Sequence, residues 1–211
     1  MPKEEQKVWY ACYGSNLLEE RFRCYIGGGQ PKGAHRIYPG CTNKTFPTRT
    51  KGLIINREMY FAKISKTWSG GGAAFIKSDF DKNLETLGRM YLITRQQFVD
   101  LVQQEIKFDG EFDIDLERVI EQGSLDMKND SWYGQIIYLG DEEGHPIFTF
   151  TNEEYLENEI NAPNEHYLRI IIEGLKQTYK LSPSEIQKYL EKKTGIKGFP
   201  IEKDLPKLIG N

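Results

Sequence analysis

The pattern of apolar and polar residues predicts a chain that is mostly β-strand up to about residue 151 and helical after it. Short apolar runs are separated by glycine-rich or acidic turns, which is typical of strands. We expect strands in the segments 8–12, 53–55, 60–64, 73–76, 88–93, 132–139 and 147–151. The segment 27–51 is rich in Gly, Pro, Lys and Thr. It is predicted to be a long connection with room for one short strand, and it is a candidate border of a pocket.

Apolar residues spaced three or four positions apart predict helices. We expect them at 17–26, from 94 past 105, at 166–179 and at 183–195. Polar residues mark the N-termini of two of these predicted helices. Thr94 and Gln97 form a capping box, and Ser182 is placed to cap a helix that has Pro183 first and Glu185 third.

These elements favour an α+β (mixed α/β) fold, in which a small, curved, mixed β-sheet or barrel carries flanking helices. The strand spacing is too irregular for a β-sandwich. The chain has 211 residues, of which 38% are hydrophobic and 28% charged, and this suits a globular domain with a substantial core. We expect this domain to span residues 1–180 and a C-terminal helical extension, residues 181–211, to pack against it.

Charge, cysteines and histidines narrow the class of protein. The formal net charge is only −3 and no basic stripe occurs, so we expect no nucleic-acid partner. No apolar run reaches the length of a membrane span, and the polar start, Met1–Glu5, lacks the core of a signal peptide. Three cysteines without a Cys-x-x-Cys pair, and three histidines, His35 among them, without metal-ligand spacing predict neither disulfides nor a metal site. We expect a cytoplasmic protein that uses no metal or cofactor.

The turn Tyr13–Leu17, between the first strand and the first helix, is a candidate binding site. Gly14 permits a sharp bend or the close approach of a ligand. Asn16 is a suitable N-cap, and Glu19 stands where a capping box requires it. The first N–H groups of the helix would then point at a carboxylate or phosphate. Taken as a general pattern, a well-capped turn without a ligand is the commoner outcome.

Glu105 is the candidate acid/base. In the helix that begins at Thr94, Phe98, Leu101 and Val102 define the buried face, and Glu105 falls on the same face. Burial and the helix dipole both disfavour the charged carboxylate there, as a general acid/base near neutral pH requires. Periodicity is equally compatible with a helix that frays after Val102 and leaves Glu105 exposed. The outer, solvated face is predicted to carry Asp100, Gln103 and Gln104.

Several motifs, in order along the chain, resemble the γ-glutamyl cyclotransferase family. Tyr13–Leu17 resembles the family's substrate-binding loop, and Trp68 with the segment 70–74 resembles its Gly-Ala-containing hairpin turn. The strand 88–93 and the helix to Glu105 resemble the segment that carries the family's catalytic glutamate. The segment 162–167, with Ile171 and Gly174 behind it, resembles a later Pro-Ser-x-x-Tyr segment. The similarity touches most of residues 8–180 and implies the fold of that family.

The resemblance implies an activity: release of 5-oxoproline and a free amine from γ-glutamyl amides, by attack of the substrate's own α-amine on its γ-carbonyl. Because the nucleophile belongs to the substrate, no metal, serine or cysteine is required. Glu105 would be the general acid/base, and the partner would be a small-molecule γ-glutamyl substrate. The implied substrate-binding residues are Tyr13, Gly14, Ser15, Asn16 and Leu17.

The chain departs from the family at three positions, and other interpretations stay open. Ile106 stands where Gly often follows the glutamate, and Phe112 and Phe148 stand where members carry tyrosine. These positions bear on specificity for the leaving group. One alternative is a catalytically silent, ligand-binding or regulatory member of the fold; a weaker one is a hydrolase with Ser15 as nucleophile. The sequence predicts neither the leaving amine, which could be as large as an aminoglycoside, nor the oligomeric state.

Overall fold

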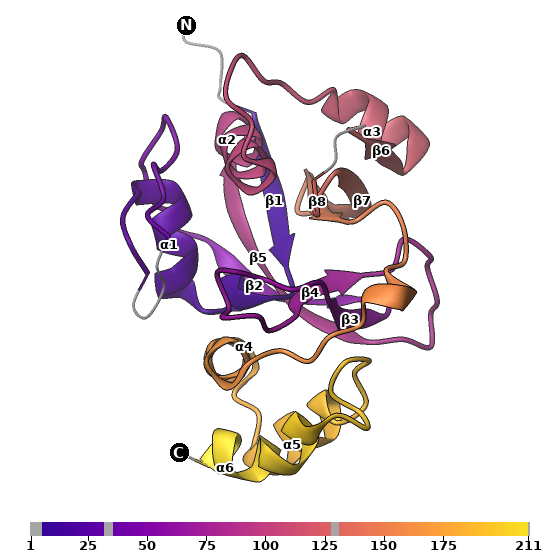
Figure 1. Ribbon diagram of the computed structural model, residues 1–211. Helices are drawn as coiled ribbons and strands as arrows, with labels where there is room; N and C mark the ends of the chain where they lie inside the picture. Colours follow the sequence, from indigo (N-terminus) through magenta and orange to yellow (C-terminus); the bar gives the residue numbers. More distant parts are fainter. Residues whose placement is uncertain (1–5, 32–35, 128–130, 211) are drawn as a thin grey trace, which may run out of the picture.

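A six-stranded mixed sheet forms the centre of the molecule (Figure 1). The computed structural model describes residues 6–31, 36–127 and 131–210, so Met1–Glu5 and His35 lie outside the described residues. The strand order is β2-β5-β1-β8-β7-β6. The bounds are β1 Lys7–Cys12, β2 Thr50–Ile55, β5 Thr86–Thr94, β6 Ser124–Asp126, β7 Gln135–Glu142 and β8 His145–Thr151. β1 runs parallel to β8, and the other pairs are antiparallel.

The central strand β1 explains why the sheet holds together. It pairs with β5 on one side and with β8 on the other, and every residue of it after Lys7 is buried. A nearly continuous apolar run is what a strand covered on both faces requires. Tyr10 of β1 stacks on Phe22 and on Phe150, with ring centroids 5.6 and 5.4 Å apart. Aromatic side chains therefore join the sheet to the first helix.

A second, two-stranded sheet completes the β structure. It pairs β3, Met59–Ala62, with β4, Ala73–Ile76, in antiparallel register. All residues of both strands are buried. The turn between them carries Trp68, whose carbonyl oxygen accepts a hydrogen bond from Asn164 Nδ2 at 2.5 Å. The predicted class, α+β with a curved mixed sheet and flanking helices, is confirmed.

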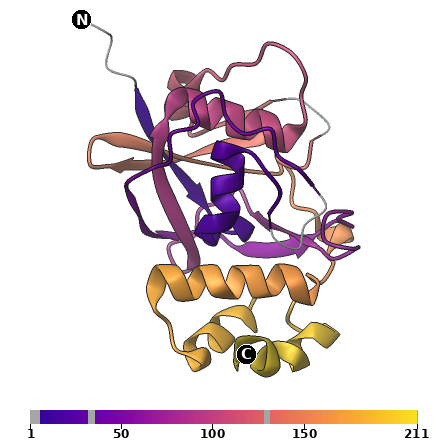
Figure 2. The same ribbon diagram turned by 90° about the vertical axis from the view of Figure 1, so that its left-hand side faces the viewer.

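The helices lie around the sheet in three places. The bounds are α1 Glu19–Gly27, α2 Arg95–Ile106, α3 Leu116–Gln122, α4 Glu165–Tyr179, α5 Pro183–Leu190 and α6 Leu205–Gly210. Single 3₁₀ turns occupy Ser15–Leu17, Glu157–Glu159 and Pro200–Asp204. α1 lies beside the sheet, α2 and α3 lie at one end, and α4 separates the sheet from α5 and α6 (Figures 1 and 2). None of these helices has the length and hydrophobicity to cross a bilayer.

The C-terminal helices share the hydrophobic core of the sheet. Ile186 and Leu190 of α5 and Ile209 of α6 belong to the same buried cluster as Val8 of β1. The Tyr189 hydroxyl accepts a hydrogen bond from the backbone N–H of Leu87 at 3.1 Å. The boundary between a domain at 1–180 and an extension at 181–211 stays a prediction.

The predicted elements are largely confirmed, with differences at their ends. Both predicted capping boxes, at Thr94 and at Ser182, are present. The helix that follows Ser182 ends at Leu190, earlier than predicted, and the strand predicted from residue 132 begins at Gln135. α3 and β6 were not predicted, because both are short and mostly polar on their outer sides.

Candidate active site

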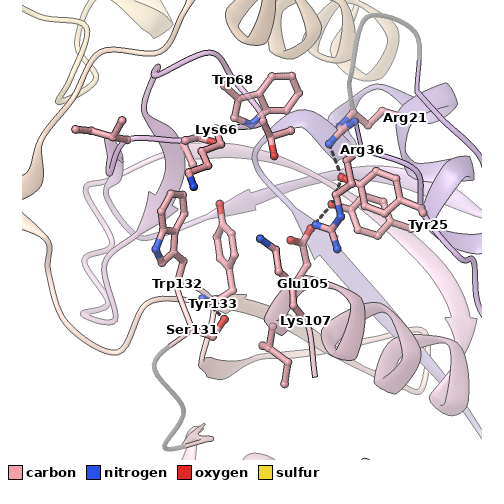
Figure 3. A pocket seen from close by; sticks show the side chains of 16 residues that line it. Arg21, Tyr25, Arg36, Lys66, Trp68, Glu105, Lys107, Ser131, Trp132 and Tyr133 are labelled. Atoms are coloured by element: carbon pink, nitrogen blue, oxygen red, sulfur yellow. Dashed lines mark hydrogen bonds between the residues drawn. The ribbon is translucent and has the colours of Figure 1, made fainter. Parts of the chain in front are cut away.

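Two adjoining cavities meet at Glu105 and Tyr133. The outer cavity has a volume of about 450 Å³, and the inner pocket has about 40 Å³, which is room for one small polar group. The outer cavity is lined mainly by Arg21, Tyr25, Arg36, Tyr38, Lys66, Trp68, Glu105, Ile106, Lys107, Trp132 and Tyr133 (Figure 3). The inner pocket is lined by Tyr10, Cys12, Tyr13, Gly14, Ser15, Asn16, Ala74, Glu105, Tyr133, Thr149, Phe150 and Tyr167.

Glu105 reaches the junction of the cavities from the last turn of α2. The helix continues to Ile106 and ends at Lys107, which has the left-handed conformation with φ of 55°, so it does not fray after Val102. Phe98, Leu101 and Val102 are fully buried, as predicted for the face that carries Glu105. Glu105 itself is half-buried. The interpretation that places Glu105 in a pocket is therefore confirmed over the exposed alternative.

The opposite side of α2 is less exposed than predicted. Asp100 and Gln104 are each only 8% exposed, so their predicted solvated positions are wrong. Asp100 Oδ2 accepts a hydrogen bond from the backbone N–H of Thr42, and Gln104 Nε2 donates to the carbonyl oxygen of Tyr25. Residues 41–45 of the long connection cover this side of the helix, and the periodicity of α2 does not predict their course.

A directed chain of hydrogen bonds ends on Glu105. The Tyr25 hydroxyl donates to Glu105 Oε1, and the hydroxyls of Tyr25 and Tyr38 lie 3.2 Å apart. Arg21 Nη2 donates to the Tyr38 hydroxyl at 2.7 Å, and Arg21 Nε donates to Ser15 Oγ at 3.1 Å. Because Tyr25 gives its single proton to Glu105, Tyr38 must donate to Tyr25. The guanidinium and both hydroxyls therefore point their protons toward the carboxylate.

These hydrogen bonds fix one carboxylate oxygen of Glu105 and leave the other oxygen available. Burial, and then the charge of Glu105, hold the pKa of Tyr25 well above its usual value, so Tyr25 remains a donor at neutral pH. No hydrogen bond from another described residue reaches Oε2 of Glu105. That oxygen is available for a proton transfer with a ligand in either cavity.

Neutral tyrosines form much of the inner pocket. The Tyr13 hydroxyl donates to the carbonyl oxygen of Phe150 at 2.8 Å, and the Tyr133 hydroxyl donates to that of Ala74 at 3.0 Å. The Tyr167 hydroxyl accepts from the Ala74 N–H at 3.2 Å. Burial raises the pKa of Tyr167 to about 12 and the pKa values of Tyr13 and Tyr133 well above the usual one. None of them ionises near neutral pH, so none is a general base there.

The inner pocket is suited to a cationic group. Asn16 Oδ1 and Thr149 Oγ1 are buried and have no hydrogen-bond partner. Buried polar atoms are rarely left unpaired, so these two point to a bound group or a water. Glu105 is the one charged side chain that the described structure places in the lining of this pocket. Cys12 also lines it, but burial raises its pKa to about 12 and it remains a thiol.

The structure places four of the five residues predicted to bind substrate in this pocket. Tyr13, Gly14, Ser15 and Asn16 line it, whereas Leu17 lines neither cavity. Leu17 is 1% exposed and packs in the core, and its carbonyl oxygen accepts a hydrogen bond from Arg89 Nη1. A Cβ atom on Gly14 would lie 2.9 Å from the Tyr167 hydroxyl. Gly14 is therefore required for a close approach of the loop to Tyr167.

The predicted capping role of Asn16 is wrong. Residues Ser15–Leu17 form a 3₁₀ turn, and α1 begins only at Glu19, with Leu18 as N-cap and no side-chain cap. The Asn16 side chain turns inward and donates from Nδ2 to the Tyr10 hydroxyl at 3.1 Å. The first turn of α1 carries Glu19 and Glu20, neither of which lines the two cavities, and the binding of an anion at the start of this helix stays a prediction.

Of the three departures from the family pattern, only Ile106 lines a cavity. Phe148 is fully buried beneath α2, with its ring centroid 5.6 Å from that of Phe98. Phe112 packs against Phe108, with ring centroids 5.7 Å apart. Neither phenylalanine stands where a hydroxyl would reach a ligand in the described cavities.

Arg21, Tyr25, Tyr38 and Tyr133 were not predicted as site residues. Arg21 and Tyr25 lie four residues apart on one face of α1, which is the one local signal that could have indicated a shared role. Tyr38 and Tyr133 come from connections that no periodic pattern describes. Tyr167 and Trp68 stand in motifs that carried the resemblance, and their rings stack at 4.3 Å.

Residues 6–31, 36–127 and 131–210 hold no group of three or more His, Cys, Asp or Glu side chains that could bind a metal ion. All three cysteines are free.

Comparison with known proteins gives similarities of two kinds. The chain is 34% identical over 200 residues to "Histone deacetylase 5" of Arabidopsis thaliana, and the match covers 88% of this chain but 30% of that protein. The chain thus spans less than a third of that relative, and most of the relative lies outside the matched region. No protein-family model matches the chain.

Two solved structures are similar to this one. A protein named "Gamma-glutamyl cyclotransferase" gives a TM-score of 0.49 at 19% identity, covering 96% of this chain and 99% of that one. An uncharacterised protein from Homo sapiens gives the same TM-score and identity, covering 98% of this chain and 100% of that one. Identity of 19% leaves the activity of this chain to be inferred from its own residues.

Proposed function

We propose that the protein releases 5-oxoproline and a free amine from γ-glutamyl amides, with Glu105 as general acid/base. The observation that carries the proposal is the position of Glu105. Among the described residues that line the two cavities it is the one carboxylate, and it stands where the cavities meet. Tyr25 holds its Oε1, and its Oε2 is available for proton transfer. The resemblance of the Tyr13–Leu17 loop to a γ-glutamyl binding loop supports the same assignment.

The reaction needs one proton acceptor and no protein nucleophile. Glu105 Oε2 takes a proton from the substrate's α-ammonium, and the amine nitrogen then attacks the γ-carbonyl carbon to close the ring. The protonated Glu105 returns the proton to the nitrogen of the leaving amine, and the former amide C–N bond breaks. Ring closure leaves a second proton on the ring nitrogen, and the regenerated Glu105 carboxylate removes this proton and passes it to the released amine. The products are 5-oxoproline and the amine in its ammonium form, and the carboxylate is regenerated. A positioned acid/base of this kind contributes about 10²–10⁴-fold in rate.

The inner pocket supplies the orientation that ring closure requires. Asn16 Oδ1 and Thr149 Oγ1 are unpaired acceptors, which suit the α-ammonium beside Glu105. With the ammonium held there, the glutamyl chain must fold back to bring its γ-carbonyl to the same junction. Orientation of this kind supplies about 7–11 kcal/mol of the barrier in well-aligned intramolecular reactions.

A panel assay tests the proposal. The wild-type protein is incubated with γ-glutamyl amino acids and γ-glutamyl amines, and 5-oxoproline is measured directly. Release from at least one member supports the proposal. A folded protein that releases no 5-oxoproline from any member would favour the silent, ligand-binding member of the fold. Such a member would still bind a γ-glutamyl amide, which calorimetry would show.

We expect Tyr25→Phe to lower kcat by about tenfold with little change in KM. The substitution removes the donor to Glu105 Oε1 and frees the carboxylate to rotate, and a hydrogen bond to a charged group is worth about 1.5–3 kcal/mol. Steady-state kinetics measures the effect. Tyr155→Phe, at an exposed tyrosine outside both cavities, is the matched control and should match wild type. An unchanged kcat in Tyr25→Phe would show that Tyr25 does not position Glu105 for the reaction.

We expect Ser15→Ala to retain turnover, with KM raised by a few-fold. Ser15 Oγ accepts a hydrogen bond from Arg21 Nε at 3.1 Å, and a guanidinium cannot act as a base toward it. A nucleophile's removal abolishes turnover, whereas loss of a binding contact mainly weakens binding. Abolished turnover in a folded Ser15→Ala protein would favour the hydrolase interpretation instead.

A further inference from the structure

The outer cavity carries a strong excess of positive charge. Arg21, Arg36, Lys66 and Lys107 line it, and Glu105 is the one acidic residue among the described residues that line it (Figure 3). We propose that the outer cavity is a subsite for a leaving amine that carries two negative charges. The proposal rests on the proposed function, since it assigns the half of the substrate that leaves.

None of the four cations forms an ion pair with a carboxylate of the described residues. The described residues form ten ion pairs within 4 Å. None of these pairs involves Arg21, Arg36, Lys66 or Lys107. Cations in one cavity repel each other, and this repulsion is relieved when an anion enters. The arrangement therefore favours binding of an anionic group.

Arg21 gives the subsite a buried anchor. It is only 4% exposed, and its Nη1 is buried without a hydrogen-bond partner, although Nε and Nη2 are both engaged. Its guanidinium carbon lies 4.8 Å from the Trp68 ring centroid, so the ring holds it in place. The charge of Glu105 acts on Arg21 without forming an ion pair with it, and the buried Nη1 is left as a donor without a partner, which an anionic ligand would satisfy.

Lys66 and Lys107 are placed to meet a second negative charge. Both are exposed side chains at the border of the cavity, Lys66 in the turn before Trp68 and Lys107 just after α2. Arg36 Nη2 donates to the carbonyl oxygen of Gln104 at 2.5 Å, which holds its side chain over the same cavity. Cations thus stand both in the depth of the cavity and at its border, which suits two separated anionic groups.

The order of the two cavities decides which part of the substrate bears the charge. The inner pocket accepts the cationic amino end beside Glu105, so the amide nitrogen and its substituent extend into the outer cavity. With a neutral amine, the α-carboxylate that all γ-glutamyl substrates share is the one anionic group that can pair with the four cations, and a polycationic aminoglycoside would be repelled. An acidic amino acid or a phosphate-bearing amine carries the two charges.

A substrate series with increasing charge tests the subsite. We expect kcat/KM to rise by about tenfold for each added negative charge, from γ-glutamyl-ethylamide to γ-glutamyl-alanine to γ-glutamyl-aspartate. γ-Glutamyl-phosphoethanolamine, compared with γ-glutamyl-aspartate, distinguishes phosphate from a second carboxylate as the source of charge. Equal kcat/KM for the ethylamide and the aspartate would overturn the anionic subsite and leave the cyclotransferase proposal standing.

Charge-removing variants assign the effect to the cavity. Lys66→Gln should lower the ratio of kcat/KM for γ-glutamyl-aspartate to that for γ-glutamyl-ethylamide by about three- to tenfold, and Lys107→Gln should act similarly. Lys188→Gln, at an exposed lysine of α5 outside both cavities, is the matched control and should keep the wild-type ratio. A ratio that falls equally in the control would overturn the assignment.

Binding of unreactive probes separates this proposal from the proposed function. N-acetyl-aspartate, N-acetyl-alanine and N-ethylacetamide carry the amide and leaving group but no α-amine, so they cannot cyclise. Quenching of tryptophan fluorescence, from Trp68 and Trp132 in the cavity wall, reports their binding. Tightest binding of N-acetyl-aspartate, weakened by Lys66→Gln, would support the subsite even if no 5-oxoproline were released. Equal binding of the three probes would overturn it.

Discussion

Glu105→Gln is expected to lower the rate of 5-oxoproline release by about 10²–10⁴-fold. Glutamine keeps the shape of the side chain and can still accept the hydrogen bond that the Tyr25 hydroxyl donates to Oε1. It cannot take a proton from the α-ammonium. The other groups at the junction do not replace it, because burial keeps Tyr13, Tyr133 and Tyr167 protonated. The loss should therefore appear in kcat, with binding of an unreactive substrate analogue preserved.

The control for this variant is Glu121→Gln, at an exposed glutamate of α3 outside both cavities. It makes the same chemical change and should leave kcat at the wild-type value. Thermal unfolding of both variants checks that the fold is retained, since Glu105 is half-buried at the end of α2 and makes no ion pair within 4 Å in the described structure. A kcat for Glu105→Gln within threefold of wild type would show that another group moves the proton.

Gly174→Ala is expected to destabilise the fold by about 1–3 kcal/mol, because it overpacks the contact between α4 and the 3₁₀ turn Ser15–Leu17. A Cβ atom at residue 174 would lie 2.4 Å from Leu17 Cβ, 2.5 Å from the Leu17 carbonyl carbon and 2.6 Å from the Leu18 nitrogen. Two of these three atoms belong to the backbone, so a change of rotamer cannot relieve the clash. The turn that carries Ser15 and Asn16 would have to move.

Thermal unfolding measures this effect, and a Tm lower by about 2–4 °C for each kcal/mol is expected for a chain of this size. Gly210→Ala is the matched control, because no heavy atom lies within 4 Å of the Cβ position there, and its Tm should not fall. Activity should fall together with stability in Gly174→Ala, since the displaced turn lines the inner pocket. An unchanged Tm would show that α4 and the 3₁₀ turn Ser15–Leu17 have room for the added methyl group.

Glu105 could be predicted because its position follows from local rules. The Thr94 capping box fixes where α2 begins, and the 3.6-residue period then places Glu105 on the same side as Phe98 and Leu101. The same rules predicted the central strand and the capped start at Ser182. They failed at Asn16, because a buried partner, the Tyr10 hydroxyl, holds the amide that local preference assigns to a cap.

The surroundings of Glu105 could not be predicted, because they are assembled from distant segments. Tyr25 is 80 residues away in the chain, and Tyr38 lies in a connection without a repeating pattern. Asp100 and Gln104 are buried by contacts with that connection and with α1, and the periodicity of α2 does not predict this burial. The outer cavity likewise brings together Arg21, Lys66 and Lys107 from a helix, a turn and a helix end. Local pattern located Glu105, whereas its partners depend on the tertiary fold.

The most direct test of the central claim follows the atoms of one turnover. A γ-glutamyl amide labelled with nitrogen-15 at its α-amine is incubated with the wild-type protein in water enriched in oxygen-18, and the products are analysed by mass spectrometry. Intramolecular attack predicts 5-oxoproline that contains the nitrogen-15 label within its ring and no oxygen-18. Glutamate with oxygen-18 in its γ-carboxylate would show hydrolysis, and would contradict the assignment of Glu105 as the acid/base of a cyclisation.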